Sequence, residues 1–132
     1  MASSRRQSRE IALQALFSVE IGHRDTGEVL DETFARARNA DRVFVKDLVY
    51  GTIENTAQSD EVIEPLLEGW TLDRLPTIDR ILLRMGVFEL QHRPETPRPV
   101  VINEAVELAK KFSTEDSGRF VNGVLSKASA LA

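Results

Sequence analysis

The sequence predicts an all-α fold with about seven helices. Apolar residues recur at intervals of three and four along most of the 132 residues, which places them on one face of successive helices. No run of four to eight residues alternates apolar and polar side chains with β-branched enrichment, so no strand is expected. Short connectors rich in Gly, Pro and Asp separate the helical segments, which is typical of a helix bundle.

Three predicted helices occupy the first part of the chain. They cover residues 5–21, 26–39 and 41–53. Ser3 or Ser4 can cap the first helix, because a serine hydroxyl accepts a hydrogen bond from a free N–H of the first turn. Gly22 follows the last apolar residue of that helix, where helices usually stop. Thr26 is the residue expected to cap the second helix.

Four further helices are predicted in the rest of the chain. They cover residues 59–67, 77–90, 99–112 and 113–125. Pro65 lies past the first turn of the fourth helix and predicts a kink or a short piece. Thr77 is expected to cap the fifth helix, and Pro99 suits the first turn of the sixth. In the last helix, Asn122 and Gly123 are expected to allow close packing against a neighbour.

Length and composition favour one soluble globular domain over residues 1–132, or two small helical halves that share a core. No stretch reaches the roughly 18 consecutive apolar residues of a membrane span. The N-terminus has basic residues but no apolar segment after them, so no secretory signal is expected. The absence of cysteine fits a reducing compartment, and we expect a cytoplasmic protein.

The charge of the chain is unevenly distributed. Three arginines, Arg5, Arg6 and Arg9, lie among the first ten residues, although the whole chain has a net charge of −4. Their spacing can place them along one face of the first helix. This pattern has two interpretations: a solvated N-terminus that carries arginine by chance, or a short cationic element that contacts phosphates.

The sequence does not favour an enzyme, a cofactor site or a metal site. It lacks cysteine, a Gly-x-Ser-x-Gly elbow, a His-Glu-x-x-His motif and a phosphate-binding loop. The two histidines, His23 and His92, follow predicted helix ends, where a partial positive charge is stabilised by the helix dipole. Binding is therefore the function class that remains.

Two phenylalanines are candidates for contacts with nucleic-acid bases. Phe17 lies in the same helix as the arginines, and Phe120 follows Arg119 near a polar turn that also contains Asp116. An aromatic ring in such a place can stack on an unpaired base. Each ring also falls on an apolar stripe, so a place in the core is the competing interpretation.

Five segments resemble the NusB family of bacterial transcription antitermination factors. They are Arg5–Phe17, Trp70–Pro76, Asp79–Arg84, Ile102–Lys110 and Phe120–Leu125. Together they span almost the whole chain, and the last two are the most specific.

The resemblance implies two three-helix bundles packed across one another and a role without catalysis. It also implies that the chain pairs with NusE, a small-subunit ribosomal protein, and that the two hold the boxA element of nascent ribosomal RNA leaders during antitermination by RNA polymerase. The RNA-binding residues that it implies are Arg5, Arg6, Arg9, Phe17, Asp73, Asp79, Asp116 and Phe120. Residues 70–92 are the expected docking segment for NusE.

Two alternatives remain open at this stage. The chain could be the NusB-like RNA-binding portion of a ribosomal RNA cytosine methyltransferase, which would need a separate cofactor-binding domain. It could also be a helical adaptor that forms a homodimer and buries its arginine-rich face.

Overall fold

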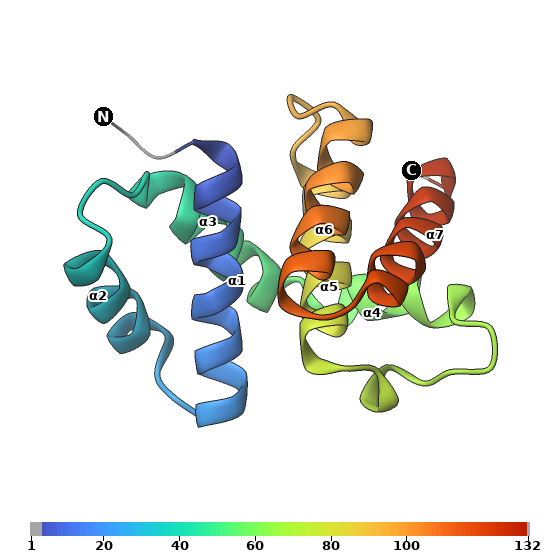
Figure 1. Cartoon of the computed structure of the whole chain (residues 1–132), viewed down its shortest axis with the longest axis horizontal. Helices are drawn as coiled ribbons and strands as arrows, with labels where there is room; N and C mark the ends of the chain where they lie inside the picture. The colour runs from blue at the N-terminus through green and yellow to red at the C-terminus, as the bar shows by residue number, and fades with distance from the viewer. Residues whose placement is uncertain (1–3, 132) are drawn as a thin grey trace. The chain divides into compact units, whose positions relative to one another are not determined.

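The computed structural model describes residues 4–131, and Figure 1 shows its helices in chain order. The α-helices are α1 (Arg5–Gly22), α2 (Thr26–Arg36), α3 (Arg42–Glu54), α4 (Thr56–Ile63), α5 (Thr77–His92), α6 (Arg98–Phe112) and α7 (Glu115–Leu131). Two 3₁₀ turns, η1 (Glu64–Leu66) and η2 (Leu72–Arg74), lie between α4 and α5. No strand occurs among the described residues, which confirms the all-α prediction.

The chain divides into two compact units, and the boundary between them falls inside α3, after Gly51. The first unit contains α1, α2 and most of α3, and the second contains α4 to α7. In the part of the chain that the structure describes, no helix is both long and apolar enough to cross a bilayer.

The first unit is built on the apolar faces of its helices. α1 packs against α2. The fully or nearly fully buried apolar side chains are Ala12, Leu13, Ala15 and Leu16 of α1, Val29, Leu30 and Phe34 of α2, and Val45, Leu48 and Val49 of α3. These positions recur at the spacing that the sequence indicated, so the three-helix pattern of this half is confirmed.

Side-chain caps fix where the first helices begin. The Ser4 hydroxyl accepts a hydrogen bond from the Gln7 backbone N–H at 3.1 Å, and the Gln7 side chain accepts one from the Ser4 N–H. This capping box confirms Ser4 as the cap; Ser3 lies outside the described residues. The prediction for the second helix was wrong by one residue, because the Asp25 carboxylate caps α2 and Thr26 is its first residue. Such caps contribute about 0.5–2 kcal/mol each.

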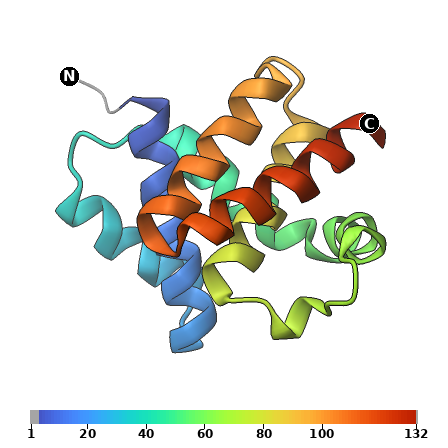
Figure 2. The ribbon, with the colours of Figure 1, turned by 45° about the vertical axis from the view of Figure 1, so that its right-hand side comes forward.

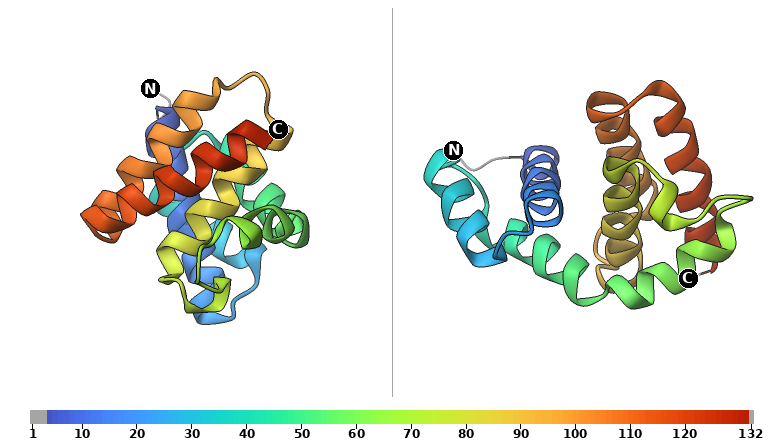
Figure 3. Two further views of the ribbon diagram at one scale, coloured as in Figure 1. Left: turned by 90° about the vertical axis from the view of Figure 1, so that its right-hand side faces the viewer. Right: turned by 90° about the horizontal axis from the view of Figure 1, so that it is seen from below.

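The second unit is organised around α5, which is buried on nearly all sides. Every residue from Met85 to Leu90 is buried, as are Ile81 to Leu83 one turn earlier. α4, α6 and α7 each pack against α5, and Figures 2 and 3 show α6 and α7 lying along it. A helix that is buried over most of its length needs neighbours on several sides, so α5 is the centre of this unit.

The connection from α4 to α5 differs in detail from the prediction. α4 begins at Thr56, three residues before the expected Ser59, which is itself buried inside the helix. α4 ends at Ile63, and Pro65 lies in η1 directly after it, so the helix is short, as the proline predicted. Thr77 is the first residue of α5 and not its cap.

A charged pair ties α4 to α5. Arg84 donates two hydrogen bonds to the Asp60 carboxylate, at 2.8 and 2.9 Å, and both side chains are mostly buried. A bidentate pair of this kind is directional, so it fixes the register of one helix on the other.

Close helix packing occurs at Gly86 and not at Gly123. A Cβ at Gly86 of α5 would lie 2.8 Å from both methyl groups of Leu125, which is fully buried. A Cβ at Gly123 would meet nothing within 4 Å, and Asn122 is exposed. The expectation for Asn122 and Gly123 was therefore wrong, because both lie on the outer face of α7.

We expect Gly86→Ala to be less stable than Gly123→Ala by about 1–3 kcal/mol. Both substitutions lie inside helices and gain the same helix propensity of about 1 kcal/mol, so their difference isolates the steric cost at Leu125. Urea unfolding of the two variants and the unsubstituted chain measures this difference. Equal stability of the two variants would show that the contact between α5 and α7 is loose.

Candidate nucleic-acid interface

The residues implicated in RNA binding fall into two groups, one on each unit. Arg5, Arg6, Arg9 and Phe17 all belong to α1 of the first unit. Asp73, Asp79, Asp116 and Phe120 belong to the second.

Arg5 is held at the surface by an aromatic ring and a carboxylate. Its guanidinium carbon lies 4.0 Å from the centroid of the Phe44 ring, and its Nη1 lies 3.3 Å from the Asp41 Oδ2. The Arg5 side chain is nevertheless 61% exposed. Cation–π stacking leaves the edge of the guanidinium, with its N–H donors, available for an anion.

The other two arginines differ from each other in exposure. Arg6 is exposed on the first turn of α1, whereas Arg9 is only 4% exposed and lies 5.3 Å from the same Phe44 ring. A guanidinium that is almost fully buried cannot grip a phosphate at the surface of this structure. The arginines thus separate into two surface cations and one internal cation that supports Phe44.

Phe17 lies two turns after Arg9 on α1 and is half-buried. Its neighbours Ala15 and Leu16 are buried, so Phe17 lies at the edge of the apolar face and not at its centre. One part of the ring therefore packs and another part reaches solvent. Phe17 is thus not a fully buried core residue, and its role in RNA binding stays a prediction.

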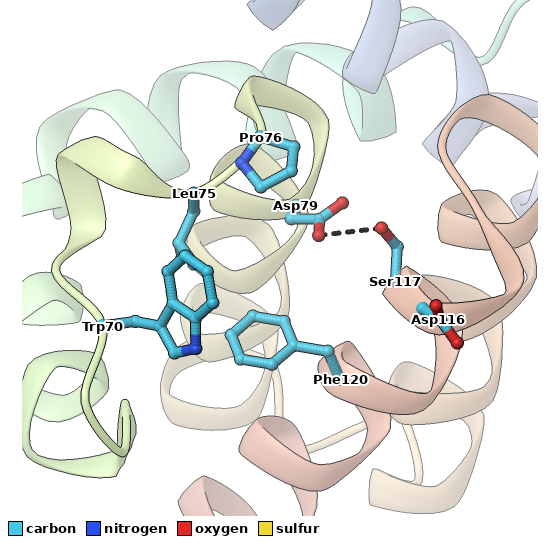
Figure 4. A pocket seen from close by; sticks show the side chains of 7 residues that line it. All are labelled: Trp70, Leu75, Pro76, Asp79, Asp116, Ser117 and Phe120. Atoms are coloured by element: carbon cyan, nitrogen blue, oxygen red, sulfur yellow. Dashed lines mark hydrogen bonds between the residues drawn. The ribbon is translucent and has the colours of Figure 1, made fainter.

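On the second unit, three of the four implicated residues line one pocket, which Figure 4 shows from close by. The pocket has a volume of about 220 Å³ and lies between the connector before α5, the first turn of α5 and the first turns of α7. Its lining consists of Trp70, Leu75, Pro76, Asp79, Asp116, Ser117 and Phe120. The structure thus brings Asp79, Asp116 and Phe120 together from segments about 40 residues apart in the sequence.

Asp79 is the buried polar group of this pocket. It is 3% exposed, and its Oδ2 accepts a hydrogen bond of 2.9 Å from the Ser117 hydroxyl. Its Oδ1 is buried without a hydrogen-bond partner. Ser117 in turn lies 2.8 Å from the Ser113 hydroxyl, so Asp79 is joined to a short polar network at the start of α7.

Asp116 lies in the first turn of α7, where the helix dipole favours a negative charge. Its side chain is 85% exposed and forms an ion pair with Arg119 one turn later. Exposed pairs of this kind are worth about 0–1 kcal/mol. Asp116 can therefore exchange Arg119 for another donor at little cost.

Asp73 does not join the pocket. It lies in η2, is exposed, and is absent from the lining that Asp79 and Asp116 share. A hydrogen bond from the Thr71 side chain lowers the pKa of Asp73, and the charges of Arg74 and Arg80 act in the same direction. Asp73 is therefore an ionised surface acceptor at neutral pH.

Trp70 is the pocket residue that the sequence left without a role in RNA binding. Trp70 is 57% exposed in the connector between η1 and η2, and its indole faces the Phe120 ring in Figure 4. The feature of the sequence that could have indicated this residue is that Trp70, the one tryptophan of the chain, follows Gly69 in a predicted loop. In the expected docking segment 70–92, most of α5 is buried, so the connector supplies most of its exposed surface.

The described residues contain no group of three or more His, Asp or Glu side chains that could hold a metal ion. The arrangement consists of cations, aromatic rings and carboxylate acceptors at the surface. These groups can bind phosphates, bases and sugar hydroxyls.

Comparison with known proteins gives matches over nearly the whole chain. A sequence profile described as the NusB family matches residues 6–130. The transcription antitermination protein NusB of Myxococcus xanthus is 45% identical over 130 residues, covering 94% of this chain and 93% of that protein. The corresponding protein of Sorangium cellulosum is 44% identical over 127 residues, covering 94% and 90%.

Solved structures give the same result. NusB of T. maritima superposes with a TM-score of 0.88 at 35% identity, covering 98% of this chain and 93% of that one. A chain from a crystal structure of the antitermination factors NusB and NusE in complex with double-stranded RNA superposes with a TM-score of 0.88 at 29% identity, covering 97% of both chains.

We expect Arg9→Ala to lower the free energy of unfolding by about 1–3 kcal/mol, whereas Arg6→Ala changes it by less than about 0.5 kcal/mol. The difference follows from the burial of the Arg9 stem and guanidinium beside Phe44 and the exposure of Arg6. Thermal unfolding of both variants tests it. A stability loss of the same size in both would contradict the distinct surroundings of the two arginines.

Ser117→Ala is expected to cost about 1–3 kcal/mol of stability, because it leaves the buried Asp79 carboxylate without its hydroxyl donor. Ser126→Ala is the matched control, since Ser126 lies on the same helix and is exposed. Urea unfolding compares them. If Ser117→Ala were as stable as Ser126→Ala, the hydrogen bond between Ser117 and Asp79 would contribute nothing to the fold.

Proposed function

Because the chain belongs to the NusB family, we propose that it is a non-enzymatic transcription antitermination factor that binds the boxA element of ribosomal RNA leaders together with NusE. The likeness to NusB proteins over residues 6–130 carries this proposal. In this role the chain joins the antitermination complex of RNA polymerase, where the transcript emerges. Such a role places it in the cytoplasm.

Arg5 and Arg6 supply the phosphate contacts in this proposal. Both are exposed at the start of α1, and the stacking of Arg5 on Phe44 orients its guanidinium before RNA arrives. Orientation in advance reduces the side-chain entropy that binding would otherwise cost. Arg9 contributes to RNA binding indirectly, by supporting the ring on which Arg5 stacks. Phe17 offers the exposed part of its ring at the same helix.

The acidic residues contribute hydrogen-bond acceptors for RNA, and they do not attract its negatively charged phosphates. Asp116 and Asp73 are exposed carboxylates that can accept a hydrogen bond from a ribose 2′-hydroxyl or an exocyclic amino group. Asp79 is buried, so RNA reaches it only through the pocket that it shares with Phe120. Asp79 and Ser117 set the position of the first turn of α7, and thereby of Phe120.

The electrostatics explain why a partner is needed. The net charge of −4 gives the chain no broad attraction for RNA, and even three phosphate contacts to a single strand give a log–log salt slope of only about −2. Affinity for RNA is then low for the chain alone. NusE supplies further positive surface in the complex.

We expect a boxA-containing RNA to bind the chain with NusE more tightly than either protein alone. In that complex Arg6→Ala is expected to weaken binding roughly 5-fold and to reduce the magnitude of the salt slope by about 0.7, the value for one phosphate contact on a single strand. Fluorescence anisotropy of labelled RNA, titrated at several salt concentrations, measures both quantities.

Lys46→Ala is the matched control, since Lys46 is an exposed cation on α3 whose removal changes the net charge equally. It is expected to leave the affinity and the salt slope nearly unchanged. Binding that NusE does not enhance, or that falls equally in Arg6→Ala and Lys46→Ala, would overturn the proposed function. Light scattering on the free chain tests the alternative of a homodimeric adaptor.

A further inference from the structure

We propose that Trp70 and Phe120 form a clamp that takes up one unpaired base of the bound RNA, with Trp70 as the main stacking surface. This inference rests on the proposed function and adds a base-binding residue that lies outside the positions implied by the family resemblance. The clamp is built entirely within the second unit, from the connector before α5 and from α7.

The two rings border two neighbouring pockets. Trp70 and Phe120 line the pocket of about 220 Å³ near Asp79, and both also line a second pocket of about 290 Å³. Figure 4 shows the indole and the phenyl ring pointing toward one another from opposite sides. Trp70 is 57% exposed and Phe120 is half-buried, so both side chains reach the surface of the pocket.

The size and lining of the first pocket suit a single flat ring system. Its volume of about 220 Å³ is below the about 300–1,000 Å³ of pockets for drug-sized ligands, which fits a ligand part as small as one base. Leu75, Pro76 and the two aromatic rings give it an apolar lining. A base inserted there would remove from water part of an indole that is now 57% exposed. Stacking of this kind accepts any base, because each has a π-face.

The second pocket provides the charge that a nucleotide needs beside its base. Arg119 and Lys127 line it together with Glu68. Both cations are engaged in exposed ion pairs, Arg119 with Asp116 and Lys127 with Glu68 at 3.0 Å. Because such pairs are worth about 0–1 kcal/mol, a phosphate can replace the carboxylates at little cost. The first pocket is mostly apolar, and Arg119 and Lys127 of the second pocket lie in weak ion pairs beside it. This combination fits a base with its phosphate better than it fits an apolar side chain of a protein.

The clamp is tested on the complex of the chain with NusE and a boxA-containing RNA. The fluorescent base 2-aminopurine, placed at one RNA position at a time, reports stacking by a loss of emission. We expect one position to be strongly quenched in the unsubstituted complex and to recover emission in Trp70→Ala. Trp70→Ala should weaken binding about 5-fold to 150-fold, and Trp70→Phe should restore most of it.

An abasic nucleotide at the quenched position completes the experiment. It should weaken binding by the unsubstituted chain as much as Trp70→Ala does, and the two changes together should cost little more than either alone. Tyr50→Ala is the control, since Tyr50 is an exposed aromatic residue on the first unit and is expected to leave affinity unchanged. Trp70 is largely exposed, and thermal unfolding of Trp70→Ala verifies that the fold is intact.

The outcomes separate this inference from the proposed function. If Trp70→Ala binds every RNA as the unsubstituted chain does while Arg6→Ala binds more weakly, the clamp is wrong and the proposed function stands. If Trp70→Ala instead weakens binding to NusE in the absence of RNA, measured by calorimetry, the pocket is a protein-docking site and the clamp is again wrong. If NusE does not enhance RNA binding at all, the proposed function itself fails.

Discussion

The burial of α5 is the constraint on which the second unit depends. α5 has no solvated face over most of its length, so α4, α6 and α7 must all cover it. α7 can approach closely because Gly86 offers no side chain where the Leu125 methyl groups pack. The same approach brings Ser117 within hydrogen-bond distance of Asp79, which ends the first turn of α5. Apolar packing and one buried hydrogen bond thus set the position of α7 together.

That position determines what the surface offers. Once the first turns of α7 are fixed, Phe120 faces the connector that carries Trp70, and a pocket opens between them. The geometry of the pocket therefore depends on the contact between Gly86 and Leu125, and a less tightly packed core would leave the position of Phe120 less well defined. The exposed ion pairs around it contribute little stability, which leaves Asp116 and Arg119 free to change partners.

On the first unit, two of the implicated arginines share one aromatic ring. Its aromatic ring at Phe44 lies near two guanidinium groups, with Arg5 at the surface and Arg9 in the interior. Under the proposed function, Arg5 and Arg6 on the first unit would contact phosphates, and the pocket on the second unit would supply aromatic surface and carboxylate acceptors.

The helices could be predicted from the amino-acid sequence, because three-and-four spacing of apolar residues reports burial on one face whatever the neighbours are. It also identified the implicated residues through the family resemblance, and their role in RNA binding stays a prediction. Three features required the folded structure: the glycine that permits close packing, the arginine that is buried, and the facing side chains of Trp70 and Phe120. These features depend on which helix covers which, and periodicity within one helix carries no information about the neighbour across the contact.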